Sequence, residues 1–513
     1  MIDGGLRPRL LARASVGASP STHEVLDPFT GEVSYSLPLS VESDVDAAFD
    51  SARRAQVSWA RTSVHERARI VLRFHDLVLA RRAEALDLLQ SETGKCRRDA
   101  LEEVLDVALV ARHYARDAAR LLRPKARRGV FPGLVKVREL HQPKGVVGVI
   151  APWNYPLTLV SGDTIPALLA GNAVVIKPDT KTSLTALWVL DLLIEAGLPE
   201  SVVRIVLGDG PGVGGMLIDR ADYVMFTGST ATGRLVAQRC GERLIDCSLE
   251  LGGKNAMIVR ADADIARSAE IAERACFANA GQLCVSIERI YVDASIADEF
   301  TAAFVERVNA LVMRPGLEWG VQMGTLISAE QRDRVLSHIA DAVAKGARVL
   351  AGGTARPDLG PNYVEPTVLT GVTDDMICLT DETFGPVVAI TAVSSDEEAI
   401  ALANDTEYGL NASVLSRDTR EAARIGARLR AGTVNINEGF AATWGSTRAP
   451  MGGMKQSGSG RRHGDAGLLK YTESQTIATA RLLGFGAPFG LSDEQWGETM
   501  ITAMGVMKRL GLK

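Results

Sequence analysis

The first third of the chain alternates apolar and polar positions with the period of an α-helix. Apolar side chains recur three or four residues apart, and Glu–Arg pairs occupy the opposite face. This pattern predicts helices over residues 43–60, 65–91 and 98–122. Proline and glycine then interrupt it, and short alternating segments around residues 134–142 predict a β-hairpin.

From residue 145 the pattern changes to short β-branched runs, each followed by a turn and a helical stretch. The first four runs cover residues 146–150, 173–176, 203–206 and 223–226. Strand–helix units at this spacing predict a doubly wound parallel sheet. A second alternating set predicts strands over 256–259, 289–292, 348–350, 387–391, 413–415 and 434–436, with helices over 265–278, 296–312 and 329–345. The predicted fold class is therefore α/β, with two doubly wound domains.

Composition narrows the class of protein further. The chain has 513 residues, of which 46% are hydrophobic and 23% charged, so it can bury a large core. Its net charge of −5 argues against a nucleic-acid-binding surface. The longest uncharged run, 145–162, contains two prolines and predicts a buried strand running into a loop, not a membrane span. Residues 1–20 are interpreted as a frayed basic arm.

Cysteine and histidine usage excludes two kinds of site. The six cysteines show neither a C-x-x-C pair nor a dense cluster, and the seven histidines lack metal-ligand spacing. We therefore expect no disulfide scaffold and no metal, and reduced thiols in a cytoplasmic protein.

Four segments carry candidate chemistry, each with a plainer alternative. Residues 228–233 follow a predicted strand and open a helix, which suits a phosphate but also suits an ordinary turn. Cys284 is a candidate nucleophile or a small buried hydrophobe. Glu250, beside two glycines, is a candidate mobile base or a strand-end carboxylate. Asn154, flanked by prolines, is a candidate oxyanion donor or an organiser of a turn.

Seven motifs occur together in the order that characterises one family. They are Pro152-Trp153-Asn154, Lys177-Pro178, Gly228-Ser229-Thr230, Glu250 to Lys254, Gly281-Gln282-x-Cys284, Glu382 to Pro386 and Pro450-x-Gly452-Gly453. Over roughly residues 25–480 this pattern resembles the NAD(P)-dependent aldehyde dehydrogenase superfamily. Residues 145–161, 177–180 and 451–464 are most similar to the actinobacterial succinate-semialdehyde dehydrogenase (NADP+) type.

The resemblance implies catalytic and cofactor roles for particular residues. Cys284 attacks the aldehyde, Asn154 and the Cys284 backbone N–H hold the oxyanion, and Glu250 activates water. The cofactor contacts that it implies are Trp153, Asn154, Lys177, Pro178, Asp179, Thr180, Ser229, Thr230, Leu251 and Glu382. NAD-preferring relatives often carry Glu at the position of Thr180. A neutral donor there, followed by Lys181, predicts that NADP+ is preferred, with NAD+ possible as a second cofactor.

The sequence also departs from the family pattern, and the departures leave the substrate open. Arg462 occupies a place where many relatives carry a proton-relaying Glu. Ala278 and Gly162 stand where well-known succinate-semialdehyde enzymes carry two carboxylate-binding Arg residues. Ser446 and Arg448 are candidate substitutes, with a solvated Arg as the plainer interpretation of Arg448.

Tyr155, Phe440 and Trp444 would equally suit an apolar or aromatic aldehyde. The prediction is oxidation of succinate semialdehyde to succinate, with a broad-specificity aldehyde dehydrogenase as the alternative. A CoA-acylating enzyme, an esterase and a catalytically silent relative are less consistent with Cys284, Glu250 and Asn154 all being present. Val285 and Ser286 leave no neighbouring thiol to form a disulfide with Cys284.

The expected domain plan has three parts. Residues 1–126 and 145–251 form the NAD(P)-binding domain, and residues 252–446 form the catalytic domain. Residues 127–144 and 465–513 form a small β oligomerisation arm and a C-terminal tail. By resemblance, such an arm links subunits into a homodimer or homotetramer.

Overall fold

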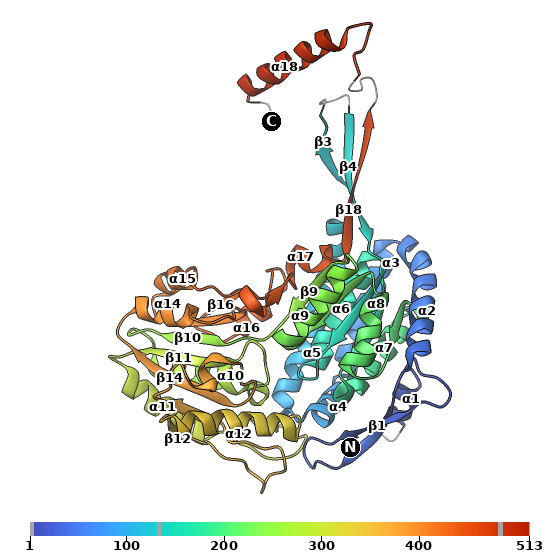
Figure 1. The fold of residues 1–513 in the computed structure, drawn as a ribbon. Helices are drawn as coiled ribbons and strands as arrows, with labels where there is room; N and C mark the ends of the chain where they lie inside the picture. Colours follow the sequence, from blue (N-terminus) through green and yellow to red (C-terminus); the bar gives the residue numbers. More distant parts are fainter. Residues whose placement is uncertain (1–4, 131–134, 481–485, 512–513) are drawn as a thin grey trace. The chain divides into compact units, whose positions relative to one another are not determined.

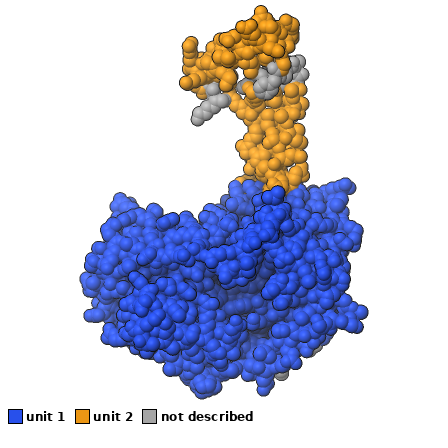
Figure 2. Space-filling view, in the orientation of Figure 1, with its two compact units in different colours: residues 1–119, 143–471 blue, residues 120–142, 472–513 orange. Residues whose placement is uncertain are grey.

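The computed structural model describes residues 5–130, 135–480 and 486–511. The chain divides into two compact units (Figure 2). Unit 1 comprises residues 1–119 and 143–471, and unit 2 comprises residues 120–142 and 472–513. Both large sheets belong to unit 1, so the expected boundary at residue 251 stays a prediction.

The first sheet of unit 1 has six strands in the order β17-β9-β8-β5-β6-β7 (Figure 1). Its members are β5 (Val146–Ala151), β6 (Ala173–Pro178), β7 (Val203–Ile205), β8 (Tyr223–Thr227), β9 (Cys247–Glu250) and β17 (Gly458–Ser459). All are parallel to their neighbours except β17, which runs antiparallel to β9. The four predicted strands are confirmed, whereas β9 and β17, short and polar, lacked an apolar run that would have predicted them.

Helices accompany this sheet. They are α2 (Glu42–Arg61), α3 (Val64–Ala80), α4 (Arg82–Thr93), α5 (Arg97–Leu122), α6 (Pro156–Ala170), α7 (Ser183–Glu195), α8 (Gly215–Arg220) and α9 (Thr230–Glu242). A β1–β2 hairpin (Thr22–Leu26, Val33–Pro38) precedes them. The helices that the amphipathic pattern predicts over residues 43–60 and 98–122 correspond to α2 and α5.

Three expectations about local structure were wrong. The predicted helix over 65–91 is two helices, because Arg81 leaves helical geometry (φ −99°, ψ 22°) between α3 and α4. The stretch after β5 is not a loop, because Pro156 occupies the first turn of α6, where its missing N–H costs nothing. The described part of the N-terminal segment, from residue 5 on, is not a frayed arm. Helix α1 (Leu6–Leu11) buries two leucines, and Arg13 pairs with Asp191.

The second sheet has seven strands in the order β12-β13-β14-β11-β10-β15-β16. They are β10 (Asn255–Val259), β11 (Ile287–Asp293), β12 (Arg348–Ala351), β13 (Thr367–Thr370), β14 (Val387–Val393), β15 (Asn411–Leu415) and β16 (Thr433–Ile436). All pairings are parallel except β12 with β13. The accompanying helices are α10 (Ile265–Phe277), α11 (Ala297–Asn309), α12 (Ala329–Ala344), α14 (Asp396–Asn404) and α15 (Thr419–Gly426). The predicted second α/β set is thus confirmed, but strand β13 and helices α14 and α15 were not predicted.

Unit 2 is a three-stranded antiparallel sheet in the order β18-β4-β3, followed by one helix. Its elements are β3 (Lys125–Arg128), β4 (Val135–Pro143), β18 (Thr472–Ala480) and α18 (Asp493–Arg509). The predicted hairpin is confirmed. Ile477 on β18 and Ile501 and Met504 on α18 are exposed. Within the described ranges, no helix is both long enough and apolar enough to cross a membrane.

Candidate active site

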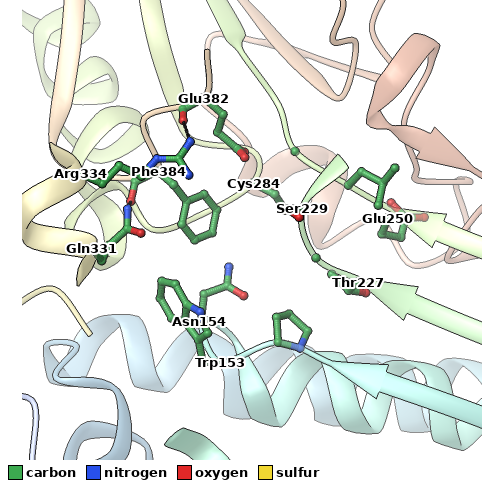
Figure 3. Close-up of a pocket in the computed structure, with 14 residues that line it drawn as sticks. Trp153, Asn154, Thr227, Ser229, Glu250, Cys284, Gln331, Arg334, Glu382 and Phe384 are labelled. Atoms are coloured by element: carbon green, nitrogen blue, oxygen red, sulfur yellow. Dashed lines mark hydrogen bonds between the residues drawn. The ribbon is translucent and has the colours of Figure 1, made fainter. Parts of the chain in front are cut away.

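Two cavities in unit 1 share the side chains of Asn154 and Cys284. The first, of about 170 Å³, is lined by Pro152, Trp153, Asn154, Thr227, Gly228, Ser229, Glu250, Leu251, Gly252, Cys284, Gln331, Arg334, Glu382 and Phe384 (Figure 3). The second, of about 50 Å³, is lined by Asp106, Val110, Asn154, Tyr155, Thr158, Leu159, Gly162, Leu283, Cys284, Val285, Trp444, Met451, Arg462 and His463. We call them the motif cavity and the small cavity. A group on Cys284 can therefore be reached from either side.

The backbone before Cys284 is held in an unusual conformation. Asn279, Ala280 and Gly281 have φ values of 51°, 54° and 72°, in the left-handed region that side chains disfavour. A Cβ on Gly281 would lie 2.1 Å from the carbonyl oxygen of Gly385, so only glycine fits. The surrounding structure must impose this turn, as is common at functional sites.

Asparagine side chains fix the loop that carries Cys284. The Nδ2 of Asn255 donates to the carbonyl oxygens of Cys284 at 2.8 Å and Ser286 at 2.7 Å. The Nδ2 of Asn411 donates to the carbonyl of Val285 at 2.9 Å. The three consecutive carbonyls are thus engaged by side chains of the second sheet, which anchors the loop.

Asn154 is positioned through its backbone and through its amide. Its carbonyl accepts hydrogen bonds from Lys95 Nζ at 2.7 Å and from Asn279 Nδ2 at 3.1 Å. Its own Nδ2 donates to the carbonyl of Gln282 at 3.1 Å. Because an amide carries two N–H groups, the second one is available to a group bound at Cys284.

Glu250 ends strand β9 and lines the motif cavity. Its Oε1 is buried and has no hydrogen-bond partner among the described residues. A Cβ on Gly452 would lie 3.1 Å from that oxygen, so glycine leaves room beside it. Burial raises the pKa of Glu250 to about 7, although the charge of Arg462 opposes the shift. A carboxyl that titrates near neutrality suits a general base.

The surroundings of Cys284 favour the thiol over the thiolate. Burial raises its pKa to about 12, Glu382 adds to the shift, and Arg462 opposes it. Nucleophilic attack therefore requires that its proton be removed.

The N-terminus of α9 faces the motif cavity. Ser229 caps the helix by accepting from the backbone N–H of Thr232 at 3.2 Å, and Thr230 Oγ1 donates to the carbonyl of Gln456 at 3.2 Å. A Cβ on Gly233 would lie 2.5 Å from Leu251, so glycine lets these elements approach closely. A helix N-terminus with small residues suits a phosphate.

Glu382 forms another wall of the motif cavity. Its Oε1 accepts from the backbone N–H of Gly253 at 2.8 Å, and burial raises its pKa to about 8. A Cβ on Gly252 would lie 2.5 Å from its Oε2. Trp153 contacts Phe384 edge to face, with ring centroids 5.5 Å apart. A carboxyl, an aromatic edge and a helix N-terminus together fit the nicotinamide and phosphate parts of a dinucleotide.

Three polar residues that line the motif cavity, Thr227, Gln331 and Arg334, were not predicted from the sequence. Arg334 Nη2 donates to the carbonyl of Glu382 at 2.6 Å, and Gln331 Nε2 donates to that of Phe384 at 2.8 Å (Figure 3). Their spacing of three residues on α12 places them on one helix face, but many surface helices show the same spacing. Nothing in the sequence distinguished this pair.

Lys177 and Pro178 end β6, and Asp179 and Thr180 follow. Lys177 is buried, and burial lowers its pKa. Asp179 Oδ1 accepts from the backbone N–H of Lys181 at 3.0 Å. None of these residues lines either cavity. They do lie at the carboxyl end of a parallel strand, where ligands of doubly wound sheets bind.

The candidate substrate residues separate into two pairs. Tyr155 and Trp444 line the small cavity and meet edge to face at 5.4 Å. Ser446 and Arg448 line neither cavity. The Arg448 side chain is 82% exposed and lies 3.6 Å from Asp117, which favours its interpretation as a solvated Arg.

Comparison with known proteins identifies the family. A model described as the aldehyde dehydrogenase family matches residues 16–477. The chain belongs to this family. The aldehyde dehydrogenase is 54% identical over 482 residues to a Mycolicibacterium smegmatis protein named "Putative succinate-semialdehyde dehydrogenase [NADP(+)]", covering 94% of this chain and 93% of the relative. It is 35% identical over 466 residues to the mitochondrial succinate-semialdehyde dehydrogenase of Oryza sativa, covering 90% and 87%.

Solved structures agree on the fold. The aldehyde dehydrogenase superposes on a betaine aldehyde dehydrogenase from Staphylococcus aureus in complex with NAD+, with a TM-score of 0.88 and 32% identity, covering 94% of this chain and 98% of that one. An NADP dependent enzyme from E. coli matches with a TM-score of 0.86 and 34% identity, covering 90% and 95%. The predicted family and fold class are confirmed.

Proposed function

We propose that this aldehyde dehydrogenase oxidises succinate semialdehyde to succinate with NADP+, using Cys284 as nucleophile and Glu250 as general base. The observation that carries the proposal is the position of Cys284 between two cavities. One has the features that suit a dinucleotide, and the other has room for a short aldehyde.

The first step joins the thiol to the aldehyde carbon. The Cys284 thiol loses its proton to a base, and we assign this role to Glu250, which lines the same cavity. The resulting thiolate attacks the carbonyl carbon to form a thiohemiacetal. The free N–H of the Asn154 amide and the backbone N–H of Cys284 then stabilise the oxyanion, each by about 3 kcal/mol.

Release of the acid depends on Glu250. NADP+, when bound, supplies the hydride acceptor that converts the thiohemiacetal to a thioester on Cys284. Glu250 releases the thiol proton to solvent and is ionised again before it takes a proton from water, which attacks the thioester and frees the Cys284 thiolate. Oε1 of Glu250 is buried and has no hydrogen-bond partner among the described residues. This supports the role, because a water molecule can donate a hydrogen bond to that oxygen.

Cofactor preference follows from the end of β6. Thr180 offers a neutral hydroxyl, and Lys181 next to it carries a positive charge, so a ribose 2′-phosphate meets no carboxylate at position 180. The names of the actinobacterial relatives support NADP+. NAD+ is expected as a weaker cofactor, and the cofactor contacts are those expected from the motifs.

The size of the small cavity supports a short substrate. A water needs about 10–15 Å³ of comparable space, so 50 Å³ admits only a few non-hydrogen atoms. The apolar lining, including Tyr155 and Trp444, favours a second candidate function, oxidation of uncharged short aldehydes with broad specificity.

We also propose a cytoplasmic homodimer or homotetramer assembled through unit 2. Unit 2 leaves Ile477 on β18 and Ile501 and Met504 on α18 exposed, and exposed apolar side chains of this kind are typical of a surface that binds a partner. Sedimentation of the full chain tests the oligomeric state.

A substrate panel tests the proposed reaction. The formation of NADPH is followed by absorbance with succinate semialdehyde, butanal and benzaldehyde, with and without CoA. We expect CoA-independent activity and the highest kcat/KM for succinate semialdehyde. Equal kcat/KM for butanal would favour the broad-specificity candidate, and CoA-dependent activity would contradict hydrolysis by Glu250.

A further inference from the structure

We propose that Arg462 binds the distal carboxylate of the substrate in the small cavity. This inference rests on the proposed function, because it assigns the recognition of a charged aldehyde to one residue. Arg462 and Cys284 line the same cavity, so a short chain bound to Cys284 extends into the space beside the guanidinium.

Both the backbone and the side chain of Arg462 are fixed. Its backbone N–H donates to the carbonyl of Met451 at 2.6 Å, and its own carbonyl accepts from Met451 at 2.8 Å. Its Nη2 donates to Asp163 Oδ2 and to Thr227 Oγ1, both at 2.6 Å, and Nε lies 3.3 Å from Asp163 Oδ1. No described residue accepts from Nη1. A carboxylate can thus bind to Nη1 without displacing an existing contact.

The charges around Arg462 favour an anion. Asp163 is buried and contacts two cations, Arg462 at 2.6 Å and Lys470 at 3.6 Å, which hold its pKa below the ordinary value although burial opposes them. Burial keeps His463 neutral, lowering its pKa to about 4. Among the groups in direct contact, Arg462 and Lys470 are cations and Asp163 is an anion, so these three side chains carry one positive charge in excess, which a substrate carboxylate would balance.

The remaining polar groups of the small cavity do not compete strongly with that carboxylate. Asp106 lines the cavity, and burial raises its pKa to about 7, so its neutral form presents a carboxylic acid in place of a second charge. Tyr155 Oη and His463 Nδ1 are buried without hydrogen-bond partners among the described residues. Both belong to residues that line the cavity, and such groups indicate that a polar ligand completes the site.

The test measures the preference for a charged over an uncharged aldehyde. The kcat/KM for succinate semialdehyde is divided by that for butanal and by that for the methyl ester of succinate semialdehyde. We expect Arg462→Gln to lower both ratios about 10- to 100-fold, because a hydrogen bond between charged groups is lost. Arg462 also opposes the pKa shifts of Cys284 and Glu250, and this general effect on turnover cancels when the two aldehydes are divided. Arg462→Lys should give an intermediate ratio, since it keeps the charge but loses the planar fork.

Lys470→Gln is the matched control. Like Arg462→Gln, it removes one positive charge beside Asp163, and Lys470 also opposes the rise in the pKa of Glu250. Lys470 does not, however, line the small cavity. We expect its ratios to match those of the parent enzyme. An equal loss in Lys470→Gln would show a long-range charge effect and overturn the contact that we propose.

Binding without turnover gives an independent measurement. Succinate should raise the melting temperature of the parent enzyme but not that of Arg462→Gln, whereas NADP+ should raise both. Parallel losses on all aldehydes, or equal stabilisation of both proteins by succinate, would overturn the inference. If Arg462→Gln does not fold, the same measurements are made on Arg462→Lys. An unchanged ratio of kcat/KM for succinate semialdehyde over butanal in that variant overturns the proposal.

The aldehyde preference of the parent enzyme distinguishes failure of the proposed function from failure of the role proposed for Arg462. If it does not prefer succinate semialdehyde to butanal, the proposed substrate fails and this inference fails with it. If it has that preference and Arg462→Gln retains it, the proposed function stands and only the role of Arg462 is wrong.

Discussion

The two cavities that meet at Cys284 are built in different ways. The motif cavity is formed largely by strand ends, glycines and a helix N-terminus, so its shape depends on the backbone. The small cavity is formed by single side chains from α5, α6, α16 (Ala441–Trp444) and the segments around residues 284, 451 and 462. The difference indicates that cofactor binding depends on local sequence motifs, whereas substrate choice depends on side chains that are distant in sequence.

Their electrostatics differ as well. The motif cavity holds Glu250 and Glu382, two carboxyls whose pKa values burial raises to about 7 and about 8. The small cavity is mostly apolar, with Arg462 as its one cationic lining residue among those described. Variants can therefore affect one cavity and spare the other.

The largest effect should come from Cys284, one of the two residues that both cavities share. Cys284→Ser replaces the thiol with a much poorer nucleophile, so kcat/KM for every aldehyde should fall about 10⁴-fold or more. NADP+ binding, measured by calorimetry, should be unchanged. Cys247→Ser is the matched control, because Cys247 is the other partly exposed cysteine and lines neither cavity. Substantial remaining activity in Cys284→Ser would rule out this nucleophile.

A smaller loss should follow from the base of the motif cavity. Glu250→Gln should lower steady-state kcat about 10²- to 10⁴-fold, because water attack on the thioester loses its base. A single burst of NADPH should still form if another group can take the thiol proton. In the parent enzyme, thioester hydrolysis should accelerate as pH rises through about 7, since ionised Glu250 is the active form. Glu250→Gln should flatten that profile, and an unchanged profile would assign the pKa to another group.

Cofactor preference should change without an effect on the small cavity. Thr180→Glu should shift the ratio of kcat/KM for NADP+ over NAD+ towards NAD+ by about 10- to 100-fold, because a carboxylate repels the 2′-phosphate. Thr180→Val is the control, since it removes the hydroxyl without adding charge and should cause a smaller shift. The preference among aldehydes should stay constant. A constant cofactor ratio would show that position 180 does not contact the 2′-phosphate.

The same contrast explains what the sequence could predict. The strands over 146–150 and 223–226 were predicted from their β-branched runs. The glycines at positions 233 and 281 stand where the backbone approaches another element closely. Both the fold and the motif cavity could therefore be predicted from short stretches of sequence. Strand β9, which ends at Glu250, has no such run and was not predicted. Ser446 and Arg448 were plausible by proximity to a motif, but only the fold shows that they line neither cavity. The position of Arg462 beside Asp163 depends on pairing across 299 residues, which no local pattern encodes.

The smallest expected effect concerns Gly162, which lines the small cavity from within α6. A Cβ at this position would meet no atom within 4 Å, and the glycine is helical, so Gly162→Ala should stabilise the protein by about 0.5–1 kcal/mol. The added methyl group narrows the cavity, so kcat/KM for benzaldehyde should fall severalfold more than that for succinate semialdehyde. Gly241→Ala in α9 is the matched control, because position 241 also has open space but lines neither cavity. Thermal unfolding and the aldehyde panel measure the two effects separately. A loss of stability, or an equal change for both aldehydes, would mean that the space beside Gly162 does not select the substrate.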